Sequence, residues 1–127
     1  MTQTSSKKTI LIVDDSASLR QAVHVALAQA GYQVIEAADG DEGLARLDGR
    51  RIHLIISDVN MPKLDGIAFV RAVKQLTDYR FIPIIMLTTE AQEDRKLEGQ
   101  AAGAKAWMVK PFRPDQMLRA VSKLILP

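Results

Sequence analysis

Five polar residues stand where short apolar runs of the chain end, and together they could carry out phosphoryl chemistry. They are Asp14, Asp15, Asp58, Thr88 and Lys110. If the three carboxylates meet, each close pair repels by roughly 4 kcal/mol at intermediate dielectric, so the cluster needs a cation. Oxygen ligands without histidine or cysteine favour a hard ion that keeps some of its water, which points to Mg²⁺, with Mn²⁺ as a substitute, over Ca²⁺.

A metal, a lysine and a hydroxyl around one carboxylate are the parts of a phosphoryl-transfer site. The metal and Lys110 would neutralise the charge on the phosphoryl oxygens. With an ordinary pKa, Asp58 is ionised at neutral pH and can attack phosphorus. Each residue alone has a simpler explanation, since an Asp-Asp pair often starts a helix and a lone threonine or lysine at a strand end usually has no special role. Only the combination is informative.

The elements that position these residues can be predicted from hydrophobic patterning. Short runs rich in β-branched residues predict buried strands at 9–13, 33–37, 53–57, 84–89 and 106–109. Apolar residues at helical spacing follow each run, in helices that begin near Ser16, Asp39, Asp65, Gln92 and Pro114. This alternation predicts an α/β fold in which a five-stranded parallel sheet with right-handed crossovers is covered by helices on both faces. The carboxyl ends of parallel strands share one edge, so the five polar residues are expected to meet there.

The fourth predicted helix, 92–102, is more polar than the others. Its only apolar stripe is Leu97 with several alanines, and Gly103 is expected to end it. We expect this helix to be weakly anchored, so that its packing can shift at low cost. The second helix is expected to end near Gly49, after Leu47.

Length and composition narrow the possible classes of protein. The chain has 127 residues, 47% of them hydrophobic and 25% charged, which suits one soluble domain. We expect a flexible tail at 1–8 and a domain at 9–127. No apolar run approaches the ~20 residues of a membrane span, and no signal peptide is evident, so we expect a cytoplasmic protein. The chain has no cysteine, which excludes disulfides and thiol chemistry. Its net charge of +2 comes from scattered lysines and arginines, which does not indicate a nucleic-acid surface.

Four motifs resemble those of a known protein family: 13–15 (VDD), 56–62 (ISDVNMP), 87–91 (LTTEA) and 109–112 (VKPF). From about Lys8 to Leu126, the chain resembles the receiver domain of bacterial response regulators, above all the stand-alone chemotaxis regulators. This resemblance implies the flavodoxin-like (βα)5 fold with strand order 2-1-3-4-5.

The same resemblance assigns the metal and acceptor residues. Asp58 corresponds to the phosphoacceptor. Asp15 corresponds to a direct Mg²⁺ ligand, and Asp14 to a carboxylate that acts through water. Asn60 corresponds to the residue whose backbone carbonyl completes the metal shell. Lys110 corresponds to the lysine that pairs with the phosphoryl group.

Further residues correspond to those that change conformation on phosphorylation and to those that set how long the phosphorylated state lasts. Thr88 matches the switch hydroxyl, and Trp107 stands where relatives have a smaller tyrosine or phenylalanine. Asn60 and Glu90 lie where relatives place residues that tune hydrolysis of the acyl phosphate. The family also implies a cis peptide bond between Lys110 and Pro111. Thr89 is bulkier than the residue common in relatives, which could slow access to Asp58.

The resemblance also implies partners. The phosphoryl donor would be a sensor histidine kinase, similar to the CheA-like kinases of chemotaxis. The output would be a protein target, such as the flagellar motor switch, bound through the surface of 92–102, 106–109 and 114–125. A non-flagellar signalling pathway or a role as a phosphate sink stays open. We expect a monomer that is not a turnover enzyme and binds neither DNA nor a membrane.

Rival functions fit the sequence less well. A phosphohydrolase of the haloacid dehalogenase type needs Asp-x-Asp after its first strand, whereas Asp14 and Asp15 are adjacent. A transcription factor is not expected, because no DNA-binding domain follows Leu126. A flavin site lacks its phosphate loop after the first strand. His24 and His53 have no partner at metal-ligand spacing and are expected to be ordinary helix and strand residues.

Overall fold

The centre of the structure is a parallel sheet of five strands. The structure is a computed structural model that describes residues 7–61, 64–89 and 95–125. The strands are β1 (Thr9–Val13), β2 (Gln33–Ala37), β3 (Leu54–Asp58), β4 (Ile84–Thr88) and β5 (Ala106–Val109). Their order is β2-β1-β3-β4-β5 and all four pairings are parallel, which confirms the predicted fold class. Most of the predicted tail, residues 1–6, and Glu90 lie outside the described residues.

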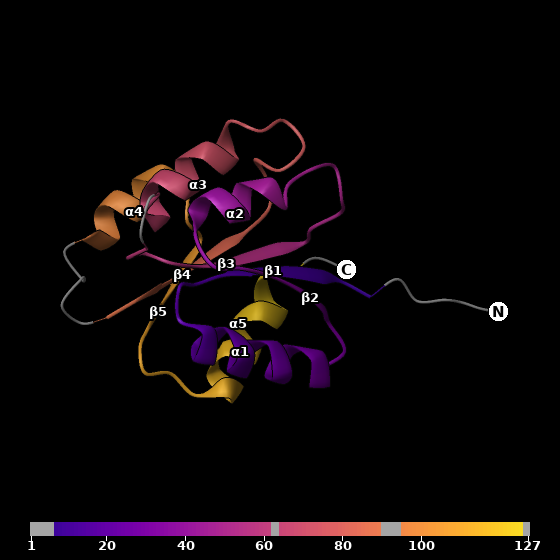
Figure 1. The fold of residues 1–127 in the computed structure, drawn as a ribbon. Helices are drawn as coiled ribbons and strands as arrows, with labels where there is room; N and C mark the ends of the chain where they lie inside the picture. The colour runs from indigo at the N-terminus through magenta and orange to yellow at the C-terminus, as the bar shows by residue number, and fades with distance from the viewer. Residues whose placement is uncertain (1–6, 62–63, 90–94, 126–127) are drawn as a thin grey trace.

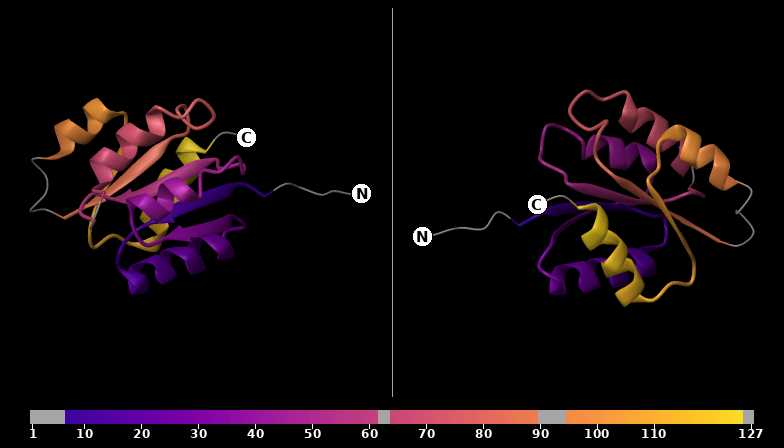
Figure 2. Two further views of the ribbon diagram at one scale, coloured as in Figure 1. Left: turned by 45° about the horizontal axis from the view of Figure 1, so that its top comes forward. Right: turned by 180° about the vertical axis from the view of Figure 1, so that it is seen from behind.

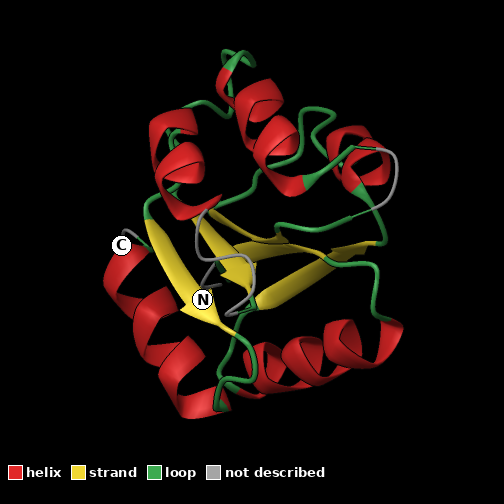
Figure 3. Ribbon diagram, turned by 90° about the vertical axis from the view of Figure 1, so that its left-hand side faces the viewer, coloured by secondary structure: helices red, strands yellow, loops and turns green. Residues whose placement is uncertain are grey.

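Helices cover both faces of this sheet. They are α1 (Ala17–Gln29), α2 (Gly40–Ala45), α3 (Gly66–Lys74), α4 (Lys96–Ala102) and α5 (Pro114–Leu124). Figure 1 shows α2, α3 and α4 on one face and α1 and α5 on the other, and the two turned views keep this layering (Figure 2). The view along the layers shows the sheet enclosed between the two groups of helices (Figure 3). Within the described residues, no helix has the length and apolar character needed to cross a bilayer.

The central strands are apolar because both of their faces are buried. Every residue of β1, β3 and β4 is buried. Side chains alternate between two cores: Leu11 and Ile55 pack towards α2 and α3, whereas Ile12 and Ile56 pack towards α1 and α5. This two-sided burial makes the strands a rigid support for the residues at their carboxyl ends.

Side-chain caps set the starts of three helices. Ser16 Oγ accepts from the Leu19 amide, while Asp39 and Asp65 carboxylates accept from the third residue beyond each. Helix α2 ends at Ala45, earlier than predicted. The chain tightens into a turn in which the Leu47 amide donates to the Leu44 carbonyl, so Leu47 still reaches the core without continuing the helix.

The expected apolar stripe of the fourth helix, formed by Leu97 with several alanines, is not the face that packs on the sheet. Leu97 is 78% exposed, whereas Gly99 is buried. Two residues span about 200° of an α-helix, so the Leu97 side chain and the helix surface at Gly99 face nearly opposite directions. A Cβ atom on Gly99 would collide with the indole ring of Trp107 in β5. The close contact of α4 with Trp107 therefore decides which face of the helix is inward, and it leaves Leu97 in solvent.

Candidate functional site

The three predicted carboxylates meet at the carboxyl edge of the sheet. Asp14 and Asp15 follow β1, Asp58 ends β3, and these two strands are neighbours. One carboxylate oxygen from each residue lies within 4.8 Å of the others. Asp14 is fully buried and Asp58 is 5% exposed, whereas Asp15 is exposed. Carboxylate oxygens that are this close, with one open to solvent, suit a hard divalent cation.

Asp14 is fixed by the turn between β1 and α1. Its Oδ1 accepts from the Ser16 amide at 2.8 Å, and its backbone carbonyl accepts from Arg20 Nη1 at 2.7 Å. Its own amide donates to the Ala37 carbonyl at 3.1 Å. These bonds hold one carboxylate of the cluster rigidly. Sequence reasoning missed Arg20 as a support, although a basic residue in the first turns after an Asp-Asp pair was a usable signal.

Lys110 joins the cluster from the end of β5, the outermost strand next to β4. Its Nζ lies 3.1 Å from Asp58 Oδ1 and 3.2 Å from Asp14 Oδ2. The Lys110 amide donates to the Thr88 carbonyl, which ties the end of β5 to the end of β4. The Lys110–Pro111 peptide bond is cis. One ammonium group therefore serves two buried carboxylates.

The negative charge of the three carboxylates exceeds the positive charge of Lys110. Burial and the neighbouring charge of Asp14 raise the pKa of Asp58, and the opposing effect of Lys110 does not fully offset them. Burial lowers the pKa of Lys110, but the carboxylates of Asp14 and Asp58 outweigh it, so the net shift is upward. Lys110 is thus firmly cationic, and Asp58 is a carboxylate whose charge is incompletely compensated.

Thr88 lies beside this cluster at the end of β4. It is 2% exposed, and its hydroxyl donates to the Thr89 carbonyl at 3.1 Å. An open hollow of about 490 Å³ adjoins the site, lined in part by Thr89, Lys110 and Phe112. This hollow leaves one side of Lys110 accessible to another molecule.

Trp107 connects the site region to α4. Its indole packs in the core between the sheet and the α3–α4 side, where Gly99 leaves room for the ring. Within the part of the chain that the structure describes, the buried indole Nε1 has no hydrogen-bond partner. The missing side chain of Gly99 was the sequence signal for this contact, but a glycine in a polar helix does not identify its neighbour.

The other predicted residues lie in the loop after β3, outside the described residues, or at other parts of the fold. Asn60 is exposed in the loop after β3. Glu90 is not among the described residues. His24 Nδ1 lies 2.6 Å from Glu36 on β2, which Arg20 also contacts, and His53 accepts a hydrogen bond from the Thr9 amide. Both histidines lie away from the three carboxylates.

Comparison with known proteins identifies the class of protein that this fold and site define. Residues 10–122 match the response regulator receiver domain, so the chain belongs to that family of signalling regulators. Among solved structures it is similar to the chemotaxis protein CheY4 of Vibrio cholerae. The two share 48% identity, with a TM-score of 0.90 over 94% of this chain and 100% of that one.

Other relatives include a transcriptional regulatory protein and the receiver domain of a sensor kinase. The chain is 38% identical to the phosphate regulon transcriptional regulatory protein PhoB of Pseudomonas aeruginosa, over 93% of this chain and 52% of PhoB. It is 27% identical to the receiver domain of the sensor histidine kinase PA1611 of Pseudomonas aeruginosa PAO1, with a TM-score of 0.86 over 94% of this chain and 98% of that one. That structure holds a magnesium ion in its active-site cleft. The chain spans about half the length of the curated relatives it matches.

Proposed function

We propose that the protein receives a phosphoryl group on Asp58 from the phosphohistidine of a sensor kinase. A carboxylate oxygen of Asp58 forms the new P–O bond while the P–N bond to the imidazole breaks, and the imidazole nitrogen keeps the electron pair. The single observation that supports this most strongly is the convergence of Asp14, Asp15 and Lys110 on Asp58. A kinase partner of this kind implies a cytoplasmic location.

The donor set around Asp58 fits Mg²⁺, and Mn²⁺ as a substitute. Asp15, Asp58 and the backbone carbonyl of Asn60 would hold the ion directly, and Asp14 through water. When bound, the ion neutralises carboxylate charge and the charge on the phosphoryl oxygens. Lys110 already pairs with both buried carboxylates. Its ammonium group is therefore close enough to Asp58 to pair with an oxygen of the new phosphoryl group.

Phosphorylation then changes the local charge balance. The new group adds about −1.5 to −2 charge and three strong acceptors. We infer that the Thr88 hydroxyl turns from the Thr89 carbonyl to a phosphoryl oxygen and that Trp107 responds by repacking. Such a response would pass to α4 through Gly99, which contacts the indole. Asn60, together with Glu90, would set how fast water removes the group, and we expect no turnover of other substrates.

The output surface that we propose is formed by α4, β5 and α5. It carries two exposed apolar side chains, Leu97 at 78% and Val109 at 42%. These give a partner protein an apolar contact whose placement depends on how α4 packs. The likeness to CheY4 favours a chemosensory target such as the flagellar motor switch; a non-flagellar pathway or a phosphate sink is the second candidate.

Phosphotransfer tests the acceptor assignment. A radiolabelled, phosphorylated sensor kinase is mixed with the protein and with Asp58→Asn, both with Mg²⁺, and label on each chain is followed in time. We expect rapid transfer to the parent and none to Asp58→Asn. Equal labelling of the two would reject the proposed acceptor.

A second experiment separates the candidate outputs. The protein is immobilised with and without beryllofluoride, which mimics phospho-Asp58, and purified motor-switch protein is passed over it. Retention that requires beryllofluoride and falls in Leu97→Ser supports the motor target. Dephosphorylation of the kinase without any retention supports the phosphate sink.

A further inference from the structure

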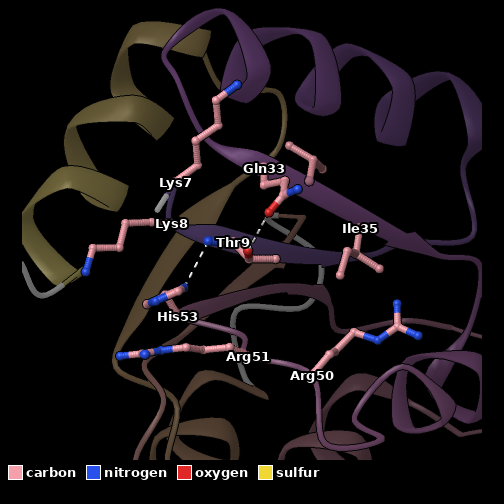
Figure 4. A pocket seen from close by; sticks show the side chains of 9 residues that line it. Lys7, Lys8, Thr9, Gln33, Ile35, Arg50, Arg51 and His53 are labelled. Carbon is pink, nitrogen blue, oxygen red and sulfur yellow. Dashed lines mark hydrogen bonds between the residues drawn. The ribbon is translucent and has the colours of Figure 1, made fainter. Parts of the chain in front are cut away.

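The opposite edge of the sheet carries a cationic hollow. Because the strands are parallel, the starts of β1 and β2 and the residue before β3 lie at the edge away from the carboxylates. A hollow of about 460 Å³ opens there, lined by Lys8, Thr9, Gln33, Arg51 and His53 among others (Figure 4). Its size is in the range of small-ligand sites. No residue of the proposed phosphoacceptor site lines this hollow.

His53 is held in this hollow as a neutral donor. Its Nδ1 accepts a hydrogen bond from the Thr9 amide at 2.9 Å. A neutral imidazole that accepts through Nδ1 carries its proton on Nε2, so the second nitrogen is an N–H donor. Protonation of Nδ1 would break the bond to Thr9. The fold therefore selects one tautomer of His53 and leaves its Nε2–H for another partner.

Lys8 and Arg51 bring two full positive charges close to this imidazole. In Figure 4 the Lys8, Arg51 and His53 side chains extend to the same side of the hollow. Burial lowers the pKa of His53, and the charges of Lys8 and Arg51 lower it further, which reflects their proximity. Among the residues that the structure describes, neither Lys8 nor Arg51 has an ion-pair partner, whereas Arg50 is paired with Asp48 at 2.8 Å.

We propose that Lys8, Arg51 and His53 form a binding site for the phosphate group of a small phosphorylated molecule or for inorganic phosphate. An ammonium, a guanidinium fork and an imidazole N–H supply donors that match several phosphate oxygens at once. A neighbouring hollow of about 370 Å³ shares these three residues and includes Asp78 and Phe81. Phe81 is 85% exposed, so an organic group attached to the phosphate has an aromatic surface beside it.

A small ligand fits the surface better than a nucleic acid does. Only two cationic side chains, those of Lys8 and Arg51, converge on the neutral imidazole of His53, and Asp78 lies beside them. The whole chain has a net charge of only +2, without a basic stripe. The site also differs from the phosphoacceptor in needing no metal, because its groups are two cations and a neutral N–H donor rather than carboxylates.

Nuclear magnetic resonance of the ¹⁵N-labelled chain tests this site. The protein is kept in EDTA at constant ionic strength and neutral pH, and orthophosphate or adenosine monophosphate replaces chloride. We expect saturable shifts of the His53 ring nitrogens and the Thr9 amide. Lys8→Gln and Arg51→Gln should each weaken binding about fivefold or more, as expected for loss of one partly exposed charged hydrogen bond. Lys123→Gln removes an exposed charge on α5 and should leave binding unchanged.

The two ligands separate the possible sources. Tighter binding of adenosine monophosphate that is lost in Phe81→Ala assigns an aromatic phosphorylated molecule, whereas equal binding assigns the phosphate group alone. Shifts that do not saturate, or that are the same in Arg51→Gln and Lys123→Gln, overturn the proposal. Because the test uses no Mg²⁺ and no phosphorylation, failure would leave the assignment of Asp58 intact.

Discussion

At the scale of single residues, the central feature is that one lysine is shared by two buried carboxylates. Lys110 lies 3.1 Å from Asp58 and 3.2 Å from Asp14. This arrangement leaves the pKa of Asp58 above its ordinary value, because burial and Asp14 outweigh Lys110. The buried carboxylates thus repel each other, and a bound cation would reduce this repulsion. A bound cation would also offset the further negative charge that the proposed phosphorylation of Asp58 brings.

Asp58→Asn should stabilise the metal-free protein at neutral pH by about 1 kcal/mol, because it removes one of two close buried carboxylates. The folded-state pKa of Asp58 is raised above its ordinary 3.8. The stability that the parent's carboxyl contributes is therefore full below pH 3.8 and is lost as the pH rises through the raised value. The gain from Asp58→Asn should accordingly shrink on acidification.

Urea unfolding in EDTA over a pH series measures this difference. Asp48→Asn is a matched control at an exposed carboxylate whose pKa is lowered by Arg50, so its effect should have the opposite sign. A parent protein more stable than Asp58→Asn at neutral pH would contradict the account of the site.

Lys110→Ala should destabilise the metal-free protein by about 1–3 kcal/mol, since two buried carboxylates lose their counter-ion. The free energy of urea unfolding in EDTA measures the loss. Lys123→Ala, at an exposed position of α5, should change it by less than about 0.5 kcal/mol. If Lys110→Ala and Lys123→Ala change the free energy of unfolding equally, Lys110 does not stabilise the two buried carboxylates.

At the scale of elements, α4 is joined to the sheet by an unusual contact. Gly99 is buried against the indole of Trp107, and the indole Nε1 is buried without a partner among the described residues. An unpaired buried N–H group is costly. A ring packed in this way can leave its place at a low net cost, which suits the proposed response of β5 and α4 to phosphorylation.

Gly99→Ala should force the indole or α4 to move, because the added methyl group would overlap the ring. We expect a loss of about 1–3 kcal/mol in stability from this overpacking. Fluorescence of Trp107, the single tryptophan, should shift, as the ring becomes more exposed. Urea unfolding and the emission spectrum measure both effects.

Two variants make this prediction specific. Gln100→Ala changes an exposed neighbour on α4 and should leave emission unchanged. Trp107→Phe combined with Gly99→Ala should recover part of the stability, because the smaller ring leaves room for the methyl group. Absence of any recovery would mean that the glycine serves the helix rather than the ring.

At the scale of the whole molecule, the parallel sheet places acidic and basic side chains at opposite edges. Its carboxyl edge gathers Asp14, Asp15 and Asp58, whereas its amino edge gathers Lys8, Arg51 and His53. Because all strands run the same way, every loop after a strand joins the first group and every loop before a strand joins the second. The fold therefore places the proposed cation site and the proposed anion site at opposite edges of the sheet.

Mg²⁺ should stabilise the whole fold, because it binds the folded site and not the unfolded chain. At about 100 times its Kd, the gain is about 2.7 kcal/mol. Asp15→Asn should reduce this gain while leaving metal-free stability nearly unchanged, since Asp15 is exposed. Thermal unfolding with and without Mg²⁺ measures both, and Asp41→Asn serves as an exposed carboxylate control. An equal Mg²⁺ effect in all three proteins would remove Asp15 from the metal site.

The sequence predicted the strands well because two-sided burial leaves a strong local pattern in runs such as 9–13 and 84–88. It also predicted that Asp58 and Lys110 would meet, because the edge of a parallel sheet follows from strand direction alone. It failed at Leu97, where the packing of Gly99 on Trp107 determines the inward face. That His53 is an ordinary strand residue stays a prediction, and its grouping with Lys8 and Arg51 arises only when β1 and β3 pair.

The mass of the intact chain after incubation with a small acyl phosphate shows whether Asp58 accepts a phosphoryl group. We predict that the parent gains one phosphoryl group with Mg²⁺ and none in EDTA, that Asp58→Asn gains none in either, and that peptide mapping places the group on Asp58. A phosphoryl group on Asp58→Asn at the parent's rate, or on the parent at a residue outside the carboxylate cluster, would contradict the account.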